Sequence, residues 1–255
     1  MSVIGVIPAR LQSTRLPRKL LLDSTGKPLL QYAWESACQA TSLDEVIIAT
    51  DSDEIAQVAR GFGAEVEMTG EHPSGTDRVA EVARGLTSNC THIVNLQGDE
   101  PDLNPESVDL LVEAMLLDGF VQMATLATPV TEVAVLSDPS CTKVVCDASG
   151  RAMYFSRCPI PFVRDGDIEP GDEGSPWLLH LGIYAYCRDF LLELAAMPPS
   201  RLERLEKLEQ LRALEAGARL QVAIVDEPSV GIDTRDDYAR FVARQSGADS
   251  ERLAG

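Results

Sequence analysis

Short apolar runs alternate with amphipathic stretches over the first half of the chain. Four runs predict buried strands, at residues 3–7, 45–50, 65–68 and 91–96. Helical patterns separate and follow them, at residues 29–40, from about 54 to 62, at 76–86 and at 105–118. This strict β-α order predicts an α/β fold with a doubly wound, mostly parallel sheet. Ligands bind such sheets outside the carboxyl ends of the strands, so the loops there are the first places to search for a site.

The pattern changes after residue 120 and becomes richer in strands. Further strands are predicted at residues 121–128, 142–146, 153–155, 180–186 and 220–225. Helices are predicted at residues 189–197 and 201–216, and from Thr234 as N-cap to about Ala243. We therefore predict one domain over residues 1–245. It has a first half at about 1–120, a smaller β-rich elaboration at 121–217, and a closing strand and helix at 218–245. Residues 159–176 read as a mobile loop and residues 246–255 as a flexible tail.

Leucine recurs every third residue in the helical pattern that begins at Arg201. The five positions are Leu202, Leu205, Leu208, Leu211 and Leu214. At ~3.6 residues per turn, this spacing spreads the leucines around about 240° of one helix. Such a helix is expected to pack on two sides, against the sheet and against something else such as a second subunit.

A cluster of cations follows the first predicted strand. Arg10, Arg15, Arg18 and Lys19 lie within ten residues, although the chain carries 40 acidic and 22 basic residues. A local basic loop at the carboxyl end of a strand indicates an anionic ligand, and a nucleotide phosphate group is the best candidate. The alternative is a basic loop that is only solvated.

Composition excludes several classes of partner. A net charge of −18 argues against nucleic acid and against an anionic membrane, because both need a basic face. The six cysteines form no CxxC pair and no zinc spacing, which is typical of reduced thiols in a cytoplasmic protein. The first ten residues do not resemble a signal peptide, and no apolar run approaches the ~18 residues of a membrane span.

Two aspartates follow predicted strands and are candidates for binding Mg²⁺. Asp99 lies in Gln97-Gly-Asp-Glu-Pro101, directly after an apolar strand, and Asp233 follows the last strand. Magnesium sites commonly use one or two carboxylates together with phosphate oxygens. Asp99 could instead be a turn or helix-cap residue, and Asp233 could instead be an N-cap.

A polar face is predicted on the strand at residues 180–186. His180, Gly182, Tyr184 and Tyr186 alternate along it and could line a sugar-binding pocket. Glu209 and Gln210 interrupt the leucine-rich pattern and could bind hydroxyl groups. Each of these polar residues could equally be solvated and have no function.

Six motifs, in order along nearly the whole chain, resemble those of the 3-deoxy-manno-octulosonate cytidylyltransferase family. They are Ile7-Pro-Ala-Arg10 with Ser13-Thr-Arg-Leu-Pro17, His72-Pro-Ser-Gly-Thr-Asp-Arg78, Asn95-Leu-Gln-Gly-Asp-Glu-Pro101, Tyr154-Phe-Ser-Arg157, His180-Leu-Gly-Ile-Tyr-Ala-Tyr186 and Leu205-Glu-Lys-Leu-Glu-Gln-Leu-Arg212. The resemblance implies a fold of the nucleotide-diphospho-sugar transferase (GT-A-like) kind, and a homodimer whose β-rich elaboration binds sugar and mediates dimerisation. It implies the reaction of CTP with 3-deoxy-D-manno-octulosonate (Kdo) to CMP-Kdo and pyrophosphate, with Mg²⁺ as cofactor, for lipopolysaccharide biosynthesis.

The resemblance also implies roles for individual residues. Arg10, Arg15 and Lys19 would hold the CTP phosphates, and Arg10, Lys19, Asp99 and Asp233 would be the catalytic set, with both aspartates on Mg²⁺. Pro8, Ala9, Ser74 and Gly75 would flank the base and ribose. The residues expected to face the sugar acid are Arg78, Gln97, Arg157, His180, Tyr184, Glu209 and Gln210.

The chain departs from the family pattern at two places. Arg18-Lys19-Leu20 stands where the family commonly has Gly-Lys-Pro, which adds a charge beside the phosphates. Cys158 stands where a small hydroxyl residue is common. Two other functions remain open at this stage: a cytidylyltransferase for another sugar acid, such as amino-Kdo or a sialic acid, and a nucleotide-binding protein without catalytic activity.

Overall fold

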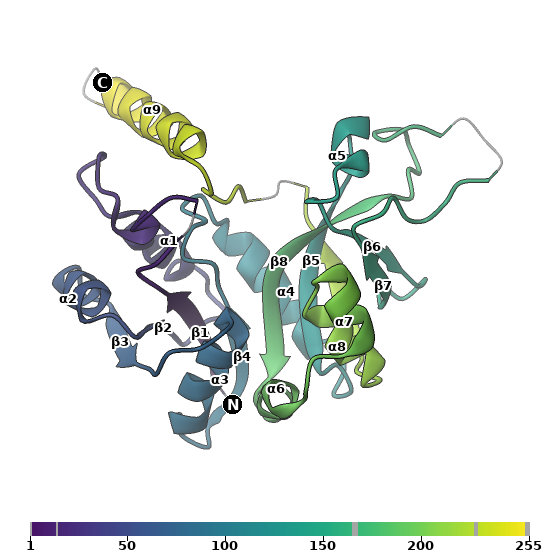
Figure 1. The fold of residues 1–255 in the computed structure, drawn as a ribbon, viewed down its shortest axis with the longest axis horizontal. Helices are drawn as coiled ribbons and strands as arrows, with labels where there is room; N and C mark the ends of the chain where they lie inside the picture. Colours follow the sequence, from purple (N-terminus) through teal and green to yellow (C-terminus); the bar gives the residue numbers. More distant parts are fainter. Residues whose placement is uncertain (1, 14, 165–167, 227–228, 253–255) are drawn as a thin grey trace. The chain divides into compact units, whose positions relative to one another are not determined.

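The chain divides into two compact units in a computed structural model, which describes residues 2–13, 15–164, 168–226 and 229–252 (Figure 1). Unit 1 contains residues 1–90, 95–106 and 229–255, and unit 2 contains residues 91–94 and 107–228. The C-terminal segment therefore belongs to the same unit as the N-terminal strands. Thr14 of the basic loop and part of the predicted mobile loop, residues 165–167, lie outside the described residues.

Unit 1 contains three parallel strands in the order β3-β2-β1. They are β1 (Ser2–Ala9), β2 (Glu45–Thr50) and β3 (Glu65–Met68). Ile7 lies opposite Ile48 in the register, and both side chains are fully buried. Burial on both faces explains why these strands read as continuous apolar runs without alternation.

Two helices of unit 1, α2 (Asp53–Gly61) and α3 (Gly75–Gly85), begin at serine caps. The others described are α1 (Leu29–Ala37), α9 (Arg235–Arg252) and the short 3-10 helix η1 (Lys19–Leu21). The hydroxyl groups of Ser52 and Ser74 accept the backbone N–H of Ile55 and Asp77 at the starts of α2 and α3. Helix α9 runs to Arg252, so the predicted end near Ala243 is too early, and residues 253–255 of the predicted tail are not described.

A small apolar cluster joins the two ends of the chain within unit 1. Leu16 and Leu29 pack with Ile232 and Phe241, and all four are buried. The ring of Tyr32 meets that of Phe241 edge-on, with centroids 5.1 Å apart. This packing places the segment before α9 beside the basic loop.

Unit 2 contains a mixed set of strands in the order β4-β8-β5-β9. These are β4 (Cys90–Asn95), β8 (Leu178–Cys187), β5 (Met123–Pro129) and β9 (Leu220–Ile224). Strand β5 pairs antiparallel with β8 and parallel with β9. The antiparallel hairpin of β6 (Lys143–Cys146) and β7 (Ala152–Ser156) attaches to β8 through β6. The α/β fold with a β-rich elaboration is therefore confirmed.

The helices of unit 2 differ from the sequence analysis in two places. They are α4 (Pro105–Leu116), α5 (Val133–Ser137), α6 (Arg188–Ala196), α7 (Arg201–Glu206) and α8 (Gln210–Glu215), of which α5 was not predicted. The single helix expected at residues 201–216 is wrong. Lys207 adopts a left-handed conformation with φ of 56°, which ends α7 and turns the chain into α8.

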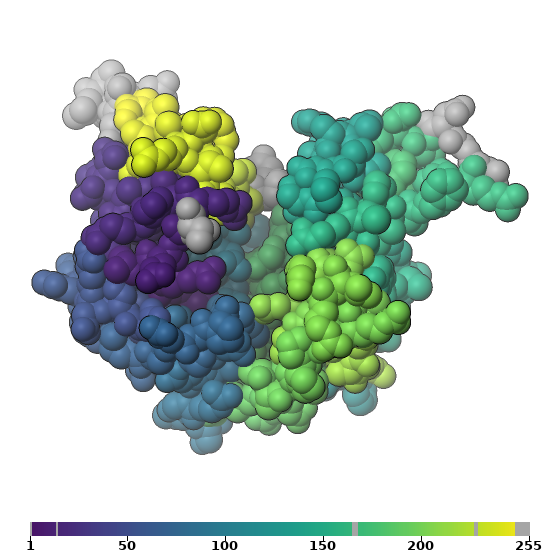
Figure 2. Space-filling view, viewed as in Figure 1, coloured from purple at the N-terminus to yellow at the C-terminus, as the bar shows by residue number. Residues whose placement is uncertain are grey.

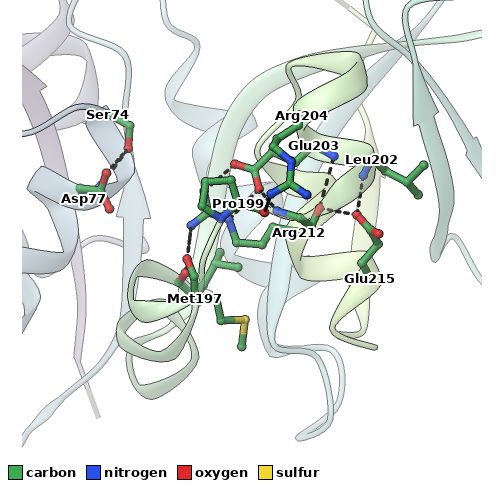
Figure 3. Close-up of polar contacts among 11 residues, drawn as sticks. Ser74, Asp77, Met197, Pro199, Leu202, Glu203, Arg204, Arg212 and Glu215 are labelled. Carbon is green, nitrogen blue, oxygen red and sulfur yellow. Dashed lines mark hydrogen bonds and ion pairs between the residues drawn. The ribbon is translucent and has the colours of Figure 1, made fainter.

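The two short helices are held together by an ion pair that crosses the turn. The Arg212 guanidinium of α8 donates to the Glu203 carboxylate of α7 at 2.5 and 2.8 Å, and also to the carbonyl of Met197 (Figure 3). Ser200 and Glu203 form a capping box at the start of α7. This pair of helices lies on the face of unit 2 seen in Figure 2, in yellow-green. No helix within the described ranges is both long and apolar enough to cross a membrane.

Candidate functional site

Lys19 binds two carboxylates at the carboxyl edge of the unit 1 strands. Its Nζ donates to Asp99 Oδ2 at 2.5 Å and to Asp233 Oδ1 at 3.0 Å. The Lys19 side chain is only 11% exposed, against 28% for Asp99 and 43% for Asp233. A single ammonium group therefore brings together two aspartates that are remote in sequence from each other and from the lysine.

Backbone contacts fix the position of Asp99. The N–H of Leu96 donates to the carbonyl of Val6 at 2.9 Å, and the N–H of Ile232 donates to the carbonyl of Asp99 at 2.9 Å. At Gly98 an added Cβ would lie 3.1 Å from the Ile7 side chain, so glycine allows the loop to lie directly on β1. The carboxylate of Asp99 is thereby held against Lys19, and the alternative of a simple turn or cap residue loses support.

Asp233 does not cap the last helix. The hydroxyl of Thr234, the residue before α9, accepts the N–H of Asp237 at 3.2 Å, as an N-cap does. The Asp233 carboxylate instead contacts Lys19 and Arg15, and the distance from Arg15 Nη2 to Asp233 Oδ2 is 3.0 Å. Arg15 is 67% exposed, so this second pair contributes little to stability and leaves the guanidinium accessible to an anion.

The extra arginine of the loop has a partner of its own. Both terminal nitrogens of Arg18 donate to the Glu54 carboxylate of α2, one of them at 3.0 Å. Arg18 has a left-handed backbone with φ of 57°, just before η1. This pairing neutralises the charge that departs from the family pattern. Arg10, by contrast, is exposed where β1 ends.

Residues predicted to flank a nucleoside come together at the start of α3. A Cβ added at Gly75 would lie 3.3 Å from the Pro8 side chain, so the absence of a side chain allows α3 to approach β1. The Ser74 hydroxyl donates to the Asp77 carboxylate at 2.9 Å and accepts its N–H (Figure 3). Ala9 is buried at the end of β1. The structure thus brings Pro8 and Gly75 into contact.

Arg78 is buried among protein groups. Its guanidinium lies 3.1 Å from the Asp51 carboxylate and donates to the hydroxyl of Thr69 at 2.5 Å and to the carbonyl of Gly70 at 3.3 Å. These contacts join α3 to the ends of β2 and β3. Gln97 is partly buried beside Gly98. Contact of either residue with a sugar acid stays a prediction.

A row of aromatic rings lines unit 2, as the alternation along the strand predicted. The ring of His180 lies 5.5 Å from that of Tyr184, which lies 6.0 Å from that of Tyr186. The ring of Phe155 meets His180 edge-on at 4.9 Å. A bulge in β8 breaks strict alternation, because Thr125 pairs with Tyr184 whereas its neighbour Leu126 pairs with Leu181.

His180 is held as a neutral imidazole. Burial lowers the pKa of His180 to about 3, although part of its surface stays accessible. Its Nε2 lies 3.0 Å from the Thr125 hydroxyl, which itself donates to the Ile183 carbonyl at 2.8 Å. With the single hydrogen of that hydroxyl on the Ile183 carbonyl, the Nε2–H of His180 would donate to Thr125 and Nδ1 would be an acceptor.

The start of α8 supplies two further polar groups to unit 2. Gln210 is 4% exposed, and its Nε2 has no hydrogen-bond partner among the residues that the structure describes. Burial, then Tyr186 and the Glu209 carboxylate, raise the pKa of Tyr184. A buried amide donor without an acceptor in the protein is available to a ligand oxygen.

Arg157 lies among backbone carbonyl groups. Its Nε donates to the carbonyl of Glu206 at 2.6 Å, and Nη1 donates to that of Pro139 at 2.8 Å. Nη2 donates to the carbonyl of Lys207 at 3.4 Å. The role expected of it, contact with the sugar acid, stays a prediction.

Sequence analysis missed Thr125, Glu54 and Lys143. The Lys143 side chain is fully buried, and its Nζ donates to the carbonyls of Asp138, Cys141 and Arg157 at 2.5–2.9 Å. A lysine directly before the two valines of a predicted strand, Val144 and Val145, was the signal that could have identified it, since unpaired lysines are almost never fully buried.

The two aspartates that share Lys19 are suited to hold Mg²⁺. No group of three or more His, Cys, Asp or Glu side chains in the described part of the chain could hold a metal ion by itself. Two carboxylates at one point, with further ligands from phosphate and water, are what Mg²⁺ commonly uses. Asp99 and Asp233 therefore fit this ion when a nucleotide is also bound.

A basic loop and a pair of carboxylates at the carboxyl ends of parallel strands define a nucleotide-binding α/β protein. Comparisons with known proteins agree with this class. The family model described as cytidylyltransferase matches residues 4–222. A 3-deoxy-manno-octulosonate cytidylyltransferase of Geobacter sulfurreducens is 44% identical over 96% of this chain and 99% of its own length. One of Syntrophobacter fumaroxidans is 47% identical, over 95% and 96% of the two chains.

A solved structure agrees with the sequence comparisons. The structure of CMP:2-keto-3-deoxy-manno-octonic acid synthetase complexed with CTP matches with a TM-score of 0.90 and 38% identity, over 97% of this chain and 100% of that chain. The chain belongs to the 3-deoxy-manno-octulosonate cytidylyltransferase family.

Proposed function

We propose that this protein transfers the cytidylyl group of CTP to Kdo and releases pyrophosphate. The relatives that cover nearly the whole chain carry this activity in their names, and the similar solved structure was determined with CTP. Within the structure, the observation that carries the proposal is the contact of Lys19 with Asp99 and Asp233 behind an exposed basic loop.

Unit 1 binds CTP in this proposal. Arg10 and Arg15 are exposed cations in an otherwise acidic protein, and they bind the triphosphate together with Lys19. Pro8, Ala9 and the start of α3 at Ser74–Gly75 flank the base and ribose. Arg18 is left out of this set, because both terminal nitrogens of its guanidinium donate to the Glu54 carboxylate, whereas Arg15 pairs with Asp233 through one.

Asp99 and Asp233 hold Mg²⁺ in the proposal. When bound there, the ion neutralises negative charge on the phosphates as pyrophosphate leaves. Lys19 contacts the same carboxylates in the structure, and its ammonium group would be available to phosphate oxygens if the aspartates held Mg²⁺ instead. The lysine thereby keeps two acidic side chains close together before the substrates arrive.

Unit 2 supplies the groups that bind Kdo. The unpaired Gln210 amide donates to a hydroxyl or carboxylate oxygen, and Tyr184, Glu209 and the free Nδ1 of His180 complete a polar surface for a polyol. Because His180 stays neutral, it accepts from a sugar hydroxyl and offers no charge to the carboxylate.

The reaction is a direct displacement. The oxygen of the anomeric C2 hydroxyl of Kdo forms a bond to the α-phosphorus of CTP, the bond from that phosphorus to the bridging oxygen breaks, and the hydroxyl proton passes to solvent. Catalysis comes from positioning and from neutralisation of charge by Lys19 and the basic loop. No covalent nucleotidyl-enzyme forms.

The setting follows from the same proposal. We propose a cytoplasmic homodimer that feeds lipopolysaccharide biosynthesis. None of the cysteines in the described part of the chain forms a disulfide, which suits a reducing compartment. Leu205 of α7 is 69% exposed, and such a side chain suits burial against a second copy. Sedimentation velocity measures the oligomeric state directly.

One assay tests the central proposal. Purified protein is mixed with CTP, Mg²⁺ and one of Kdo, amino-Kdo or a sialic acid, and pyrophosphate release is measured for each acid. We expect pyrophosphate release that depends on Kdo. We also expect no labelled protein after incubation with α-labelled CTP alone. If another acid gives equal or faster pyrophosphate release, Kdo is not the preferred substrate. No release with any acid would contradict the transferase activity.

A further inference from the structure

The end of α7 carries backbone carbonyls that need partners from outside the helix. The helix ends at Glu206, and Lys207 adopts the left-handed conformation that glycine usually supplies at such a position. The last carbonyls of a helix lack intrahelical donors. The chain then turns within three residues to begin α8 at Gln210.

Arg157 of the segment after β7 supplies donors to that end. Its Nε donates to the carbonyl of Glu206 at 2.6 Å, and its Nη2 donates to that of Lys207 at 3.4 Å. A cation at the C-terminus of a helix also interacts favourably with the helix dipole. The third nitrogen, Nη1, donates to the carbonyl of Pro139 at 2.8 Å, so the guanidinium ties the turn to the loop before β6.

The backbone of Arg157 is fixed on both of its sides. Its N–H donates to the Glu206 carboxylate at 3.0 Å, and its carbonyl accepts from the buried Lys143 Nζ at 2.8 Å. The Ser156 hydroxyl donates to the same Glu206 carboxylate at 2.7 Å. Because these contacts hold the main chain, they also fix the point from which the guanidinium reaches the turn.

The turn carries the groups that the proposed function assigns to the sugar acid. Gln210 is the first residue of α8, with its unpaired buried amide, and Glu209 precedes it. Burial, then Tyr186 and the Glu209 carboxylate, raise the pKa of Tyr184. A shift of the Lys207 turn therefore moves both residues.

We propose that Arg157 is a positioning residue for the sugar-acid site, which acts through the Lys207 turn on Glu209 and Gln210. The inference rests on the proposed function for the identity of the ligand. The positioning contacts themselves are those of the protein without substrate.

Hydrogen exchange of the ligand-free protein provides a test that does not depend on activity. In Arg157→Met, the amides of Lys207 and Leu211, which donate to Glu203 and Leu208, are expected to exchange roughly tenfold faster than in wild type. The matched control is Arg204→Met, because this exposed arginine of α7 also donates to a backbone carbonyl, that of Pro199, but does not contact the turn (Figure 3). Unchanged exchange in Arg157→Met would overturn the proposal.

A double-mutant cycle tests the link to substrate. At saturating CTP, Arg157→Met and Gln210→Ala are each expected to raise KM for Kdo roughly tenfold, while KM for CTP stays within about twofold. The KM for Kdo of the double variant should be no higher than that of the more impaired single variant, because both substitutions lose the same contact. Multiplied effects, roughly a hundredfold, would show that Arg157 binds the sugar acid independently and would overturn the proposal.

Substitution of Arg157 by lysine separates positioning of the Lys207 turn from direct charge contact with the sugar acid, because a long cationic side chain remains. Arg157→Lys keeps the charge but cannot donate to carbonyls in three directions from one plane. A positioning role predicts that lysine restores neither the slow exchange nor the low KM. Restoration of the KM alone would indicate charge contact with the sugar acid and would refute the proposal. Wild-type turnover in the same assay tests the proposed function separately.

Discussion

Asp99→Asn removes one negative charge from the Lys19 site while it keeps the shape of the side chain. The structural cost is small, because Lys19 retains Asp233 at 3.0 Å and the new amide oxygen can still accept a hydrogen bond. Asp99 is 28% exposed, so we expect a loss of about 1 kcal/mol in the free energy of unfolding. For a chain of this size, that loss lowers Tm by roughly 2–4 °C.

The expected cost to catalysis is much larger. If Asp99 holds Mg²⁺ beside the triphosphate, its loss removes an anionic ligand where charge develops, and kcat/KM should fall roughly 100-fold or more. That fall corresponds to about 3 kcal/mol, clearly above the cost in stability. Raising the Mg²⁺ concentration should recover part of the activity.

The assay combines pyrophosphate release across a Mg²⁺ titration with a thermal melt of the same samples. Glu54→Gln is the matched control, because it removes a carboxylate that pairs with a cation of the same loop but does not contact Lys19. The control should behave as wild type in both measurements. An Asp99→Asn protein that turns over normally at low Mg²⁺ would remove the metal site from the proposed function.

Three further predictions concern the two units separately. Arg15→Ala and Lys19→Ala should each lower kcat/KM for CTP roughly 10- to 150-fold, whereas Arg18→Ala should leave it within about threefold of wild type in the same assay. Because the folded-state pKa of His180 lies below its unfolded value, its contribution to stability is complete above about pH 6.5 and is lost as pH falls toward 3. The Tm of His180→Gln should therefore fall less between pH 7 and pH 4.5 than that of wild type. An equal fall in Tm would contradict the lowered pKa of His180. Lys207→Gly should stabilise the protein by about 1 kcal/mol in a thermal melt by relieving the left-handed backbone, whereas an alanine at that position should bring no gain.

Sequence patterns predicted the strands well where burial alone determines them. Val6 and Ile7 of β1 are buried on opposite faces, and no tertiary detail was needed to recognise that run. The leucine spacing from Leu202 was informative but led to the wrong element. It predicted one helix packed on two sides, whereas the chain forms two short helices, and Lys207 carries none of the glycine signal that usually marks such a break.

Side-chain pairing was less accessible to the sequence. The sequence offered both Thr234 and Asp233 as the cap of the last helix, and the structure confirms Thr234. The contact of Asp233 with Lys19 spans 214 residues and leaves no local pattern. The partner of Arg18 lies 36 residues away on α2, beyond any local pattern. Arg157 could be assigned only by resemblance, because its acceptors are backbone carbonyls that leave no trace in residue identity.

The long sequence separations at Lys19 have a consequence for how the protein is made. This lysine meets one aspartate 80 residues later and another 214 residues later. Leu16 and Leu29 likewise become covered only after Phe241 has been synthesised. On the ribosome, chains begin to fold from the N-terminus as they emerge. Unit 2 is thus fully synthesised before unit 1 can close, and a nascent chain halted before Ile232 has an open apolar surface and no assembled Lys19 site.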